Sequence, residues 1–434
     1  MTQPAPGQSQ HQLRSIIGGS LGNLVEWYDW YAYSAFSVYF AKHFFPAGDA
    51  TAQLLSTAAI FAVGFLMRPI GAWVMGVYAD RHGRKAGLAL SVAMMGGGSL
   101  LIALTPGAAT IGIAAPLLLL VARLLQGLSI GGEYGASATY LAEMASAGQR
   151  GHISSYQYVT LIGGQLVALS VQLVMQALLS EAAMEQWGWR IAFLIGAVLA
   201  FLVYLLRRRI DETVEFTAAK ADAPSSSGME LVRKHPRAAL LVIALTAGGT
   251  LAFYAYTTYM QKYLVNSAGF ARPQATLIMT AALALFMLLQ PVFGHLSDRI
   301  GRKPLLIGFG IAGTFFTVPL FQAIAQTHSQ LLAFALVMAG LLCISSYTSI
   351  SAIVKAELFP AHIRALGVAL PYAIANSLFG GSAEYVALWL KDAGMEPVFF
   401  YYVSGMCAVS LIVYLRMKET AKHGTMASVV ESLE

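Results

Sequence analysis

Charged residues are scarce in this sequence of 434 residues. Asp, Glu, Lys and Arg together supply 11% of the chain, whereas hydrophobic residues supply 57%. A soluble domain typically carries about 25% charged residues, so the composition excludes an ordinary soluble enzyme or binding module. It predicts instead a protein that crosses the lipid bilayer several times.

Cysteine is nearly absent as well. Cys343 and Cys407 both lie in apolar segments, where they provide neither a disulfide framework nor metal-ligand spacing. The sequence contains no Walker P-loop and no nucleophile–base constellation, so we expect no cofactor, no metal, no ATP drive and no enzymatic reaction. The first residues, MTQPAPGQSQHQ, lack the regions of a cleavable signal peptide, so the first apolar segment should remain as a helix.

Long apolar segments are the main feature of the chain. A membrane-spanning helix needs about 20 mostly apolar residues. Twelve segments of about this length occur, at 15–44, 53–79, 87–105, 114–141, 153–179, 189–207, 238–264, 274–296, 304–325, 330–354, 363–390 and 397–416. We therefore predict an all-α membrane protein with twelve transmembrane helices in two six-helix bundles, at 1–207 and 238–434, joined by a polar cytoplasmic linker at 208–237.

The basic residues are distributed unevenly between the two sets of loops. If both termini are cytoplasmic, 20 of the 27 Lys and Arg residues face the cytoplasm and five face the opposite side. Positive loop residues favour the cytoplasmic side, so we expect a multi-pass protein of the cell inner membrane with both ends inside. This placement explains the net charge of +6 without a nucleic-acid partner.

Two loops repeat the same pattern. GVYADRHGRK at 76–85 and GHLSDRIGRK at 294–303 match with a constant offset of 218 residues. Positive-inside charge alone would explain their basic residues but not the shared aspartate and glycines. We expect the two copies to latch the bundles together in one state and to release them in another. The residues expected to form this latch are Asp80, Arg84, Asp298 and Arg302.

Charged residues also occur inside the first-half spans: Glu26, Asp29, Arg68, Arg123 and Glu133. Such groups must be paired or face water, which makes them functional candidates. Glu26 lies about 18 Å into a hydrocarbon core of about 30 Å, and Asp29 follows one turn later on the same helix face. A guanidinium can bind a carboxylate through two parallel hydrogen bonds, so two arginines suit a dicarboxylate. The three acids are the candidate proton-coupling sites.

The second half offers polar and aromatic groups in place of deep charges, and we expect these groups to complete the pocket. The candidate substrate-binding residues are Arg68, Arg123, Tyr33, Tyr256, Tyr259, Lys262, Tyr372 and Asn376. Lys262 and Lys355 are the weaker candidates because they lie nearer the membrane surfaces, and Glu384 is an alternative proton site. In another interpretation, the two arginines only neutralise the buried acids.

The paired loops resemble those of the major facilitator superfamily. GNLVEWYDWYAYSAFSVYFAKHFFP, AVGFLMRPIGAWVMGVYADRHGRK and LLQGLSIGGEYGASATYLAE resemble the metabolite–proton symporter family within it. Second-half segments, among them SYTSISAIVKAELFPAHIRALGV and NSLFGGSAEYVALWLK, resemble the members that carry α-ketoglutarate. The resemblance covers nearly the whole chain, except the polar N-terminus and the linker around 218–228.

This resemblance implies the major facilitator fold and a symporter that imports α-ketoglutarate, or a related dicarboxylate, together with protons by alternating access. Its partners would be the small-molecule substrate, protons and the lipid bilayer, and we expect it to function as a monomer. Relatives that carry citrate or shikimate leave another carboxylate open. A channel or sensor with the same fold is the alternative from a different class, although the tail after Arg416 is too short for a stable coiled coil.

Overall fold

The computed structural model describes residues 6–82, 84–131, 133–208 and 228–426, and these residues fold into helices joined by short connections. The helices before the linker are α1 (Pro6–Phe44), α2 (Ala50–His82), α3 (Arg84–Leu104), α4 (Ala108–Ile111), α5 (Ala114–Ile130), α6 (Glu133–Met144), α7 (Arg150–Leu178), α8 (Glu181–Ala183) and α9 (Trp189–Arg208). We call them the first half. No strand occurs within the described ranges.

The second half comprises the helices after the linker. They are α11 (Gly228–Lys234), α12 (Pro236–Tyr254), α13 (Met260–Asn266), α14 (Arg272–Ile300), α15 (Arg302–Gln326), α16 (Gln330–Glu357), α17 (Arg364–Ala375), α18 (Ala383–Asp392), α19 (Glu396–Arg416) and α20 (Thr420–His423). Each of the twelve predicted segments is helical over most of its length, which confirms the helical class. The division at 208–237 stays a prediction, because most of that linker lies outside the described residues.

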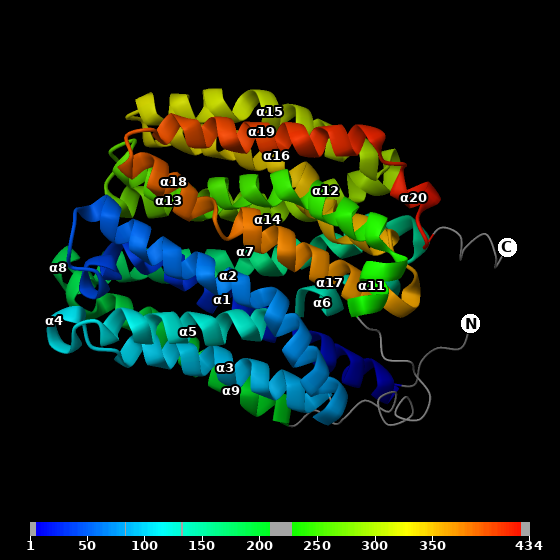
Figure 1. Ribbon diagram of the computed structural model, residues 1–434, viewed down its shortest axis with the longest axis horizontal. Helices are drawn as coiled ribbons and strands as arrows, with labels where there is room; N and C mark the ends of the chain where they lie inside the picture. The colour runs from blue at the N-terminus through cyan, green and yellow to red at the C-terminus, as the bar shows by residue number, and fades with distance from the viewer. Residues whose placement is uncertain (1–5, 83, 132, 209–227, 427–434) are drawn as a thin grey trace.

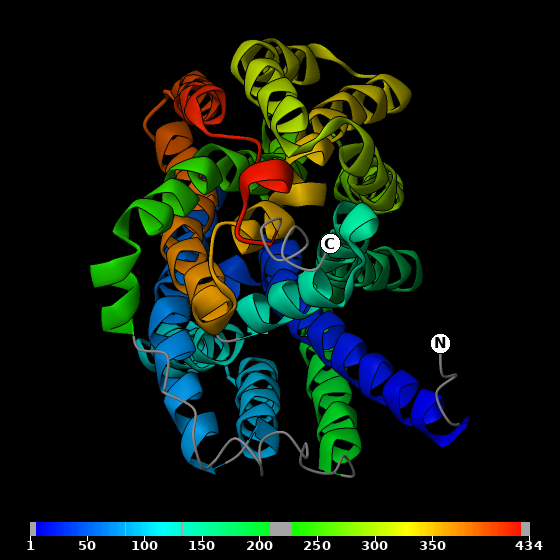
Figure 2. The ribbon, with the colours of Figure 1, turned by 90° about the vertical axis from the view of Figure 1, so that its right-hand side faces the viewer.

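The long helices run side by side along the longest axis of the molecule (Figure 1). Nine described helical stretches are long and apolar enough to cross a membrane, and two shorter apolar helices accompany them. We name the two ends of the bundle after the short helices α20 and α8, which lie at opposite ends. Seen from the α20 end, α20 lies over the middle of the bundle (Figure 2).

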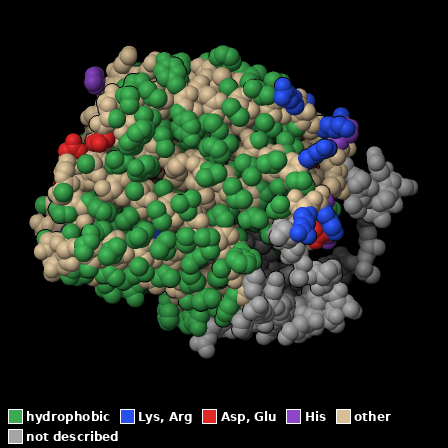
Figure 3. Space-filling model, viewed as in Figure 1, with side chains coloured by type: hydrophobic (Ala, Val, Ile, Leu, Met, Phe, Trp, Pro, Cys, Tyr) green, Lys and Arg blue, Asp and Glu red, His purple; other side chains and the backbone are tan. Residues whose placement is uncertain are grey.

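The surface matches a bilayer. Hydrophobic side chains cover the flank, while Lys and Arg side chains gather at the α20 end and Asp and Glu appear at the opposite end (Figure 3). Large apolar side chains are strongly exposed on the outside, including Trp73 at 72%, Phe315 at 68% and Leu331 at 77%. In water such exposure would be costly, but in lipid these side chains face hydrocarbon.

Three of the predicted membrane-spanning segments contain breaks in the helix that the sequence did not predict. A five-residue π-helical segment joins α12 to α13 at Ala255–Tyr259, and another joins α17 to α18 at Asn376–Gly380. The fourth predicted span is divided between α5 and α6. Single-turn π segments within helices frequently mark functional sites. Three of the predicted substrate-binding residues, Tyr256, Tyr259 and Asn376, lie in these two segments.

Glycine allows α2 and α5 to approach so closely that their backbones touch. A Cβ atom on Gly127 would lie 2.1 Å from the carbonyl oxygen of Gly64, and one on Gly131 would lie 2.2 Å from that of Arg68. Small residues at helix interfaces permit this approach in membrane proteins. The contact fixes the positions of Arg68 on α2 and Arg123 on α5 relative to each other.

We predict that Gly127→Ala lowers the melting temperature of the purified protein, because the added methyl group forces α2 and α5 apart at a cost of about 1–3 kcal/mol. Gly97→Ala on α3 is the matched control, since a Cβ there meets nothing within 4 Å. It should be neutral or slightly stabilising. Equal melting temperatures for the two variants would contradict the close contact.

Candidate functional site

The two buried arginines of the first half lie against one tryptophan. The guanidinium carbon of Arg68 is 4.3 Å from the ring centroid of Trp30, and that of Arg123 is 3.9 Å from the same ring. Arg68 is 3% exposed and Arg123 is fully buried. Cation–π attraction of this kind contributes about 2 kcal/mol or more when the cation is desolvated. Trp30 therefore holds both guanidinium groups without neutralising either.

Both arginines retain hydrogen-bond donors that have no acceptor. Nε and Nη2 of Arg68, and Nε and Nη2 of Arg123, have no hydrogen-bond partner in the part of the chain that the structure describes. Buried polar groups are usually satisfied by protein or water. A guanidinium presents such donors in the planar arrangement that a carboxylate accepts. The site is therefore chemically suited to an anion.

Arg123 is linked to Asp29 through a polar chain. Arg123 Nη1 donates to Gln126 Oε1 at 2.6 Å, and Gln126 Nε2 donates to Ser99 Oγ at 2.9 Å. Asp29 interacts electrostatically with Arg123 and lies near Ser99. Neither of its oxygens has a partner at the distance and angle of a hydrogen bond among the described residues. The carboxylate is thus coupled to the arginine charge without a direct ion pair.

Asp29 fits against α9 only because residue 196 is glycine. A Cβ on Gly196 would lie 1.7 Å from Asp29 Oδ1, and Asp29 itself is fully buried. The predicted role of Asp29 in proton coupling stays a prediction, and its packing against α9 could not be inferred from sequence. A buried carboxylate beside an arginine is a suitable place to bind and release a proton.

Glu26 occupies a different environment. Its Oε1 accepts a hydrogen bond from Ser91 Oγ at 3.2 Å, and Ser91 also bonds Ser129. Glu26 is therefore held by hydroxyl groups between α1, α3 and α5. The side chains of Glu133, Asp80 and Arg84 lie outside the described residues, so their predicted roles stay predictions.

Aromatic rings link the surroundings of Arg68 to the second half. The guanidinium carbon of Arg68 is 4.0 Å from the ring centroid of Phe65, and the Phe65 ring is 5.2 Å from that of Tyr254. The Tyr31 ring is 6.5 Å from that of Tyr254. The hydroxyl groups of Tyr31, Tyr254 and Tyr347 are buried without a hydrogen-bond partner in the described residues. These hydroxyls add further potential donors to the same interface. Tyr31 is absent from the site residues predicted from the sequence, because no motif distinguishes it from the other aromatic residues of α1.

The other predicted substrate-binding residues are not all at this interface. Tyr33 lies beside Arg123 within the first half, because its ring centroid is 4.4 Å from the guanidinium carbon and its hydroxyl donates to the Thr57 carbonyl. Asn376 accepts from Thr250 at 2.5 Å, while its Nδ2 has no partner in the described residues. Tyr256 packs against Phe321, and Tyr259 donates to Glu396 near the α8 end. Tyr256 and Tyr259 therefore make contacts within the second half.

Lys262 forms a complete ion-pair network across the two halves. Its Nζ lies 3.0 Å from Glu384 Oε1, and it also donates to the carbonyl and hydroxyl oxygens of Ser34 at 2.9 and 2.8 Å. Ser34 in turn donates to Glu384 Oε2 at 2.8 Å. All three side chains are buried. Lys262 and Glu384 thus satisfy each other and close the α8 end, helped by Arg272, which pairs with Glu181 and Glu185.

The α20 end is closed by a different set of contacts. Asp298 accepts hydrogen bonds from the backbone amides of Gly151 and His152 at 2.7 and 2.9 Å, at the start of α7. An acidic group is favoured there by the unpaired amides and the helix dipole. Asp298 also pairs with Arg302 at 2.9 Å. The carboxylate of the second repeat therefore binds the first half through backbone groups that the sequence pattern did not reveal.

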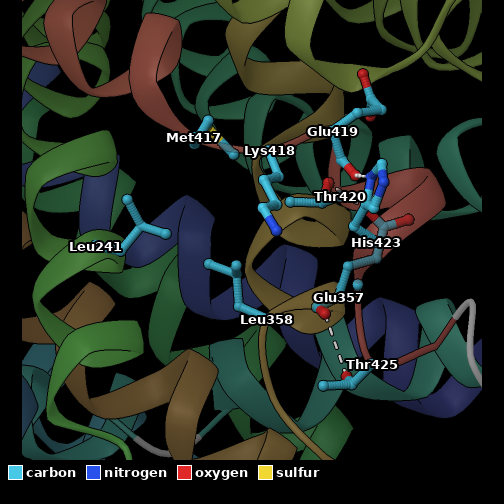
Figure 4. A pocket seen from close by; sticks show the side chains of 10 residues that line it. Leu241, Glu357, Leu358, Met417, Lys418, Glu419, Thr420, His423 and Thr425 are labelled. Carbon is cyan, nitrogen blue, oxygen red and sulfur yellow. Dashed lines mark hydrogen bonds between the residues drawn. The ribbon is translucent and has the colours of Figure 1, made fainter.

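Two cavities differ in size and position. A cavity of about 10 Å³ lies between them, lined by Tyr31, Ser34 and Gln165 on one side and Thr257 and Gln261 on the other. This is too small for a metabolite and barely enough for one water. A larger cavity of about 280 Å³ opens at the α20 end, between α12, the end of α16 and the tail around α20 (Figure 4). It lies away from the buried arginines.

Comparison with known proteins identifies the family and the fold. The profile of the family described as "Sugar (and other) transporter" matches residues 16–234 and 219–428. The chain belongs to this family. Its two successive matches cover nearly all of the sequence, and the fold is that of the major facilitator superfamily.

Curated relatives in the family cover the chain almost completely. The chain is 55% identical to the alpha-ketoglutarate permease of Escherichia coli strain K12, over 95% of each protein. It is 32% identical to the citrate-proton symporter of Klebsiella pneumoniae, over 93% of this chain and 92% of the relative. It is also 32% identical to the proline/betaine transporter of Salmonella typhimurium, over 94% and 84%.

Solved structures share the fold at low identity. The partially occluded inward-open xylose transporter XylE from E. coli superposes with a TM-score of 0.76 at 17% identity, covering 95% of this chain and 99% of that chain. The E. coli fucose:proton symporter FucP superposes with a TM-score of 0.64 at 17% identity, covering 93% and 99%. These likenesses bear on architecture alone.

The Lys262–Glu384 pair yields a stability prediction. Lys262→Met should destabilise the protein by about 3–5 kcal/mol, because it leaves the buried Glu384 carboxylate uncompensated. The double variant Lys262→Met/Glu384→Gln should recover most of that loss, since no buried charge remains. Thermal unfolding of the purified variants measures both effects.

Lys42→Met is the matched control for this test. Lys42 pairs with Glu185 at the same end but is 52% exposed, and an exposed ion pair contributes about 0–1 kcal/mol. A double variant no more stable than Lys262→Met would show that the two side chains do not act as a pair.

Proposed function

We propose that this protein is a proton-coupled secondary transporter that imports α-ketoglutarate by alternating access. The observation that carries the proposal is the pair of buried arginines, Arg68 and Arg123, which lie against Trp30 and keep N–H donors without an acceptor among the described residues. A dicarboxylate supplies the acceptors and negative charges that these groups lack. The protein would carry out no covalent chemistry.

The choice of α-ketoglutarate rests on similarity over the whole chain. The alpha-ketoglutarate permease of E. coli is 55% identical, against 32% for the citrate-proton symporter of K. pneumoniae. Citrate or shikimate is the alternative substrate. The names of both relatives refer to a small carboxylate, which agrees with a cationic rather than a neutral site.

The protein is a multi-pass protein of the bacterial inner membrane, and we propose that both termini lie in the cytoplasm. The α20 end, where Lys and Arg side chains gather in Figure 3, would face the cytoplasm, as positive residues favour that side. The α8 end, with Glu181 and Glu185, would face outward. We propose that the protein acts as a monomer, since the two halves together supply both closures and the site.

Coupling would follow from the link between Asp29 and Arg123. While Asp29 is ionised, its charge offsets that of Arg123 through the chain of Gln126 and Ser99. Protonation of Asp29 removes this offset and leaves the guanidinium free to attract a carboxylate. Substrate binding and proton binding would therefore favour each other. Glu26 and Glu133 remain the other candidate proton sites.

Alternating access would use the two closures in turn. The α8 end would open when Lys262 and Glu384 separate from Ser34, and the α20 end when Asp298 leaves the amides of α7. Both sets of contacts join the first half to the second, so each must break for one side to open. We propose the same role for Asp80 and Arg84 in the other copy of the repeat.

Uptake by the reconstituted protein tests this function. Proteoliposomes with an imposed inward proton gradient should accumulate labelled α-ketoglutarate, and a protonophore should collapse the accumulation. Sodium should not restore it. Full competition by citrate without competition by succinate would replace the proposed substrate, and uptake that does not saturate would indicate a channel.

We predict that Asp29→Asn abolishes proton-driven accumulation but retains much of the exchange of internal for external α-ketoglutarate. The amide keeps the volume of the side chain next to Gly196 but cannot carry the proton. Both activities are measured in the same proteoliposomes. Equal loss of accumulation and exchange would remove Asp29 as the coupling site.

A further inference from the structure

Two buried lysines of the second half differ in whether a carboxylate pairs with them. Lys262 and Lys355 are both 0% exposed. Lys262 has a carboxylate partner and two further acceptors. Lys355 has no acidic partner among the described side chains; its Nζ donates only to Ser351 Oγ at 2.8 Å and to Tyr134 Oη at 3.2 Å. An ammonium has three donors, so Lys355 is under-satisfied as well as unpaired.

An unpaired buried ammonium is costly. Leaving a charge in a low-dielectric interior costs several kcal/mol unless a counter-charge offsets it, and intramembrane charges without a structural partner mark ligand pathways. Two aromatic faces compensate Lys355 in part: its Nζ lies 4.1 Å from the ring centroid of Tyr372 and 5.2 Å from that of Tyr134. Neither face supplies a negative charge. No negative charge among the described side chains therefore balances the Lys355 ammonium.

Lys355 lies where the two halves meet. Tyr134 belongs to α6 of the first half, whereas Lys355 and Tyr372 belong to α16 and α17 of the second. The rings of Tyr134 and Tyr372 stack at 3.7 Å with an interplanar angle of 13°. Tyr372 thus contacts Lys355 in its own half and Tyr134 in the first half. The stacked tyrosines cover the ammonium at the point where the two halves meet.

We propose that Lys355 binds the second carboxylate of the substrate in place of the Tyr134 hydroxyl, and that this contact gives the site its preference for dicarboxylates over monocarboxylates. The arginines of the first half hold the other carboxylate. This inference rests on the proposed function. It assigns the main specificity contact to Lys355, which sequence reasoning had ranked low because of its place near the end of a span.

The assignment also explains how the substrate promotes closure. A dianion held by Arg68 on one side and Lys355 on the other contacts both halves at once. Such a ligand binds the closed arrangement better than either open one, and it shifts the population toward closure by that difference. A monocarboxylate satisfies one half only.

The test compares two ligands of the same carbon chain length, α-ketoglutarate and 2-oxopentanoate, which has one carboxylate. Equilibrium binding to the purified full-length protein is measured by titration calorimetry. Lys355→Met should weaken α-ketoglutarate binding at least about 30-fold, the lower bound for truncating one partner of a buried charge pair, while 2-oxopentanoate binding changes less than about threefold. A structural role predicts an equal loss for both ligands, and that result would overturn the proposal.

Lys234→Met is the matched control. It removes one exposed positive charge, since Lys234 is 70% exposed and pairs with Glu230 four residues earlier on α11, and it should change neither affinity. If the wild-type protein binds neither ligand, the proposed function fails. If the wild type binds α-ketoglutarate and Lys355→Met keeps its preference, only the present inference fails.

Tyr134→Phe keeps the test decisive if Lys355→Met does not fold. The variant retains the ring stacked on Tyr372 but removes the hydroxyl that the substrate must displace. We expect α-ketoglutarate to bind several-fold more tightly and 2-oxopentanoate to bind as before. Unchanged or weaker α-ketoglutarate binding would show that the Tyr134 hydroxyl does not compete with a carboxylate for Lys355.

Discussion

Burying a guanidinium or ammonium group away from water is costly unless an acid or several acceptors accompany it. In this protein Arg68, Arg123 and Lys355 are buried with donors left over. Lys355 contacts Tyr134 of the first half, and Arg68 lies against Phe65, which contacts Tyr254 of the second half. Trp30 and Tyr372 stabilise these cations with their ring faces but leave their charge in place. The rest of the site follows from this excess of positive charge.

The charged groups that close the two ends are paired, in contrast to these three cations. Lys262 with Glu384, and Arg302 with Asp298, are paired and hydrogen-bonded. Each of these cations has a counter-charge in the closed arrangement, although Arg302 Nε has no acceptor among the described residues. Water solvates both pairs when the halves separate, so opening either end leaves no unpaired charge in the interior. Paired charges therefore suit the closures, whereas unpaired charges suit the place where an anion enters. The paired charges that close the ends and the unpaired charges that would bind the anion therefore lie at different places in the molecule.

Much of the architecture could be predicted from sequence, because its signals are local. Apolar segments of membrane-spanning length give the helices, and the presence of Arg68, Arg123 and Asp29 inside those segments is read directly from the sequence. The contacts across the halves could not be predicted, since they join residues more than a hundred positions apart. Examples are Asp298 on the amides of α7 and Ser34 between Lys262 and Glu384. The π segments and the fit of Asp29 against Gly196 also depend on packing that no local pattern records.

Calorimetric titration of the wild-type protein with α-ketoglutarate and its uncharged diester tests the central claim most directly, because the two ligands share a carbon skeleton and differ in charge. If the unpaired cations form the site, one α-ketoglutarate should bind per chain and the diester should not bind measurably. Equal binding of the two ligands would contradict the claim, since the carboxylates would then contribute nothing to recognition.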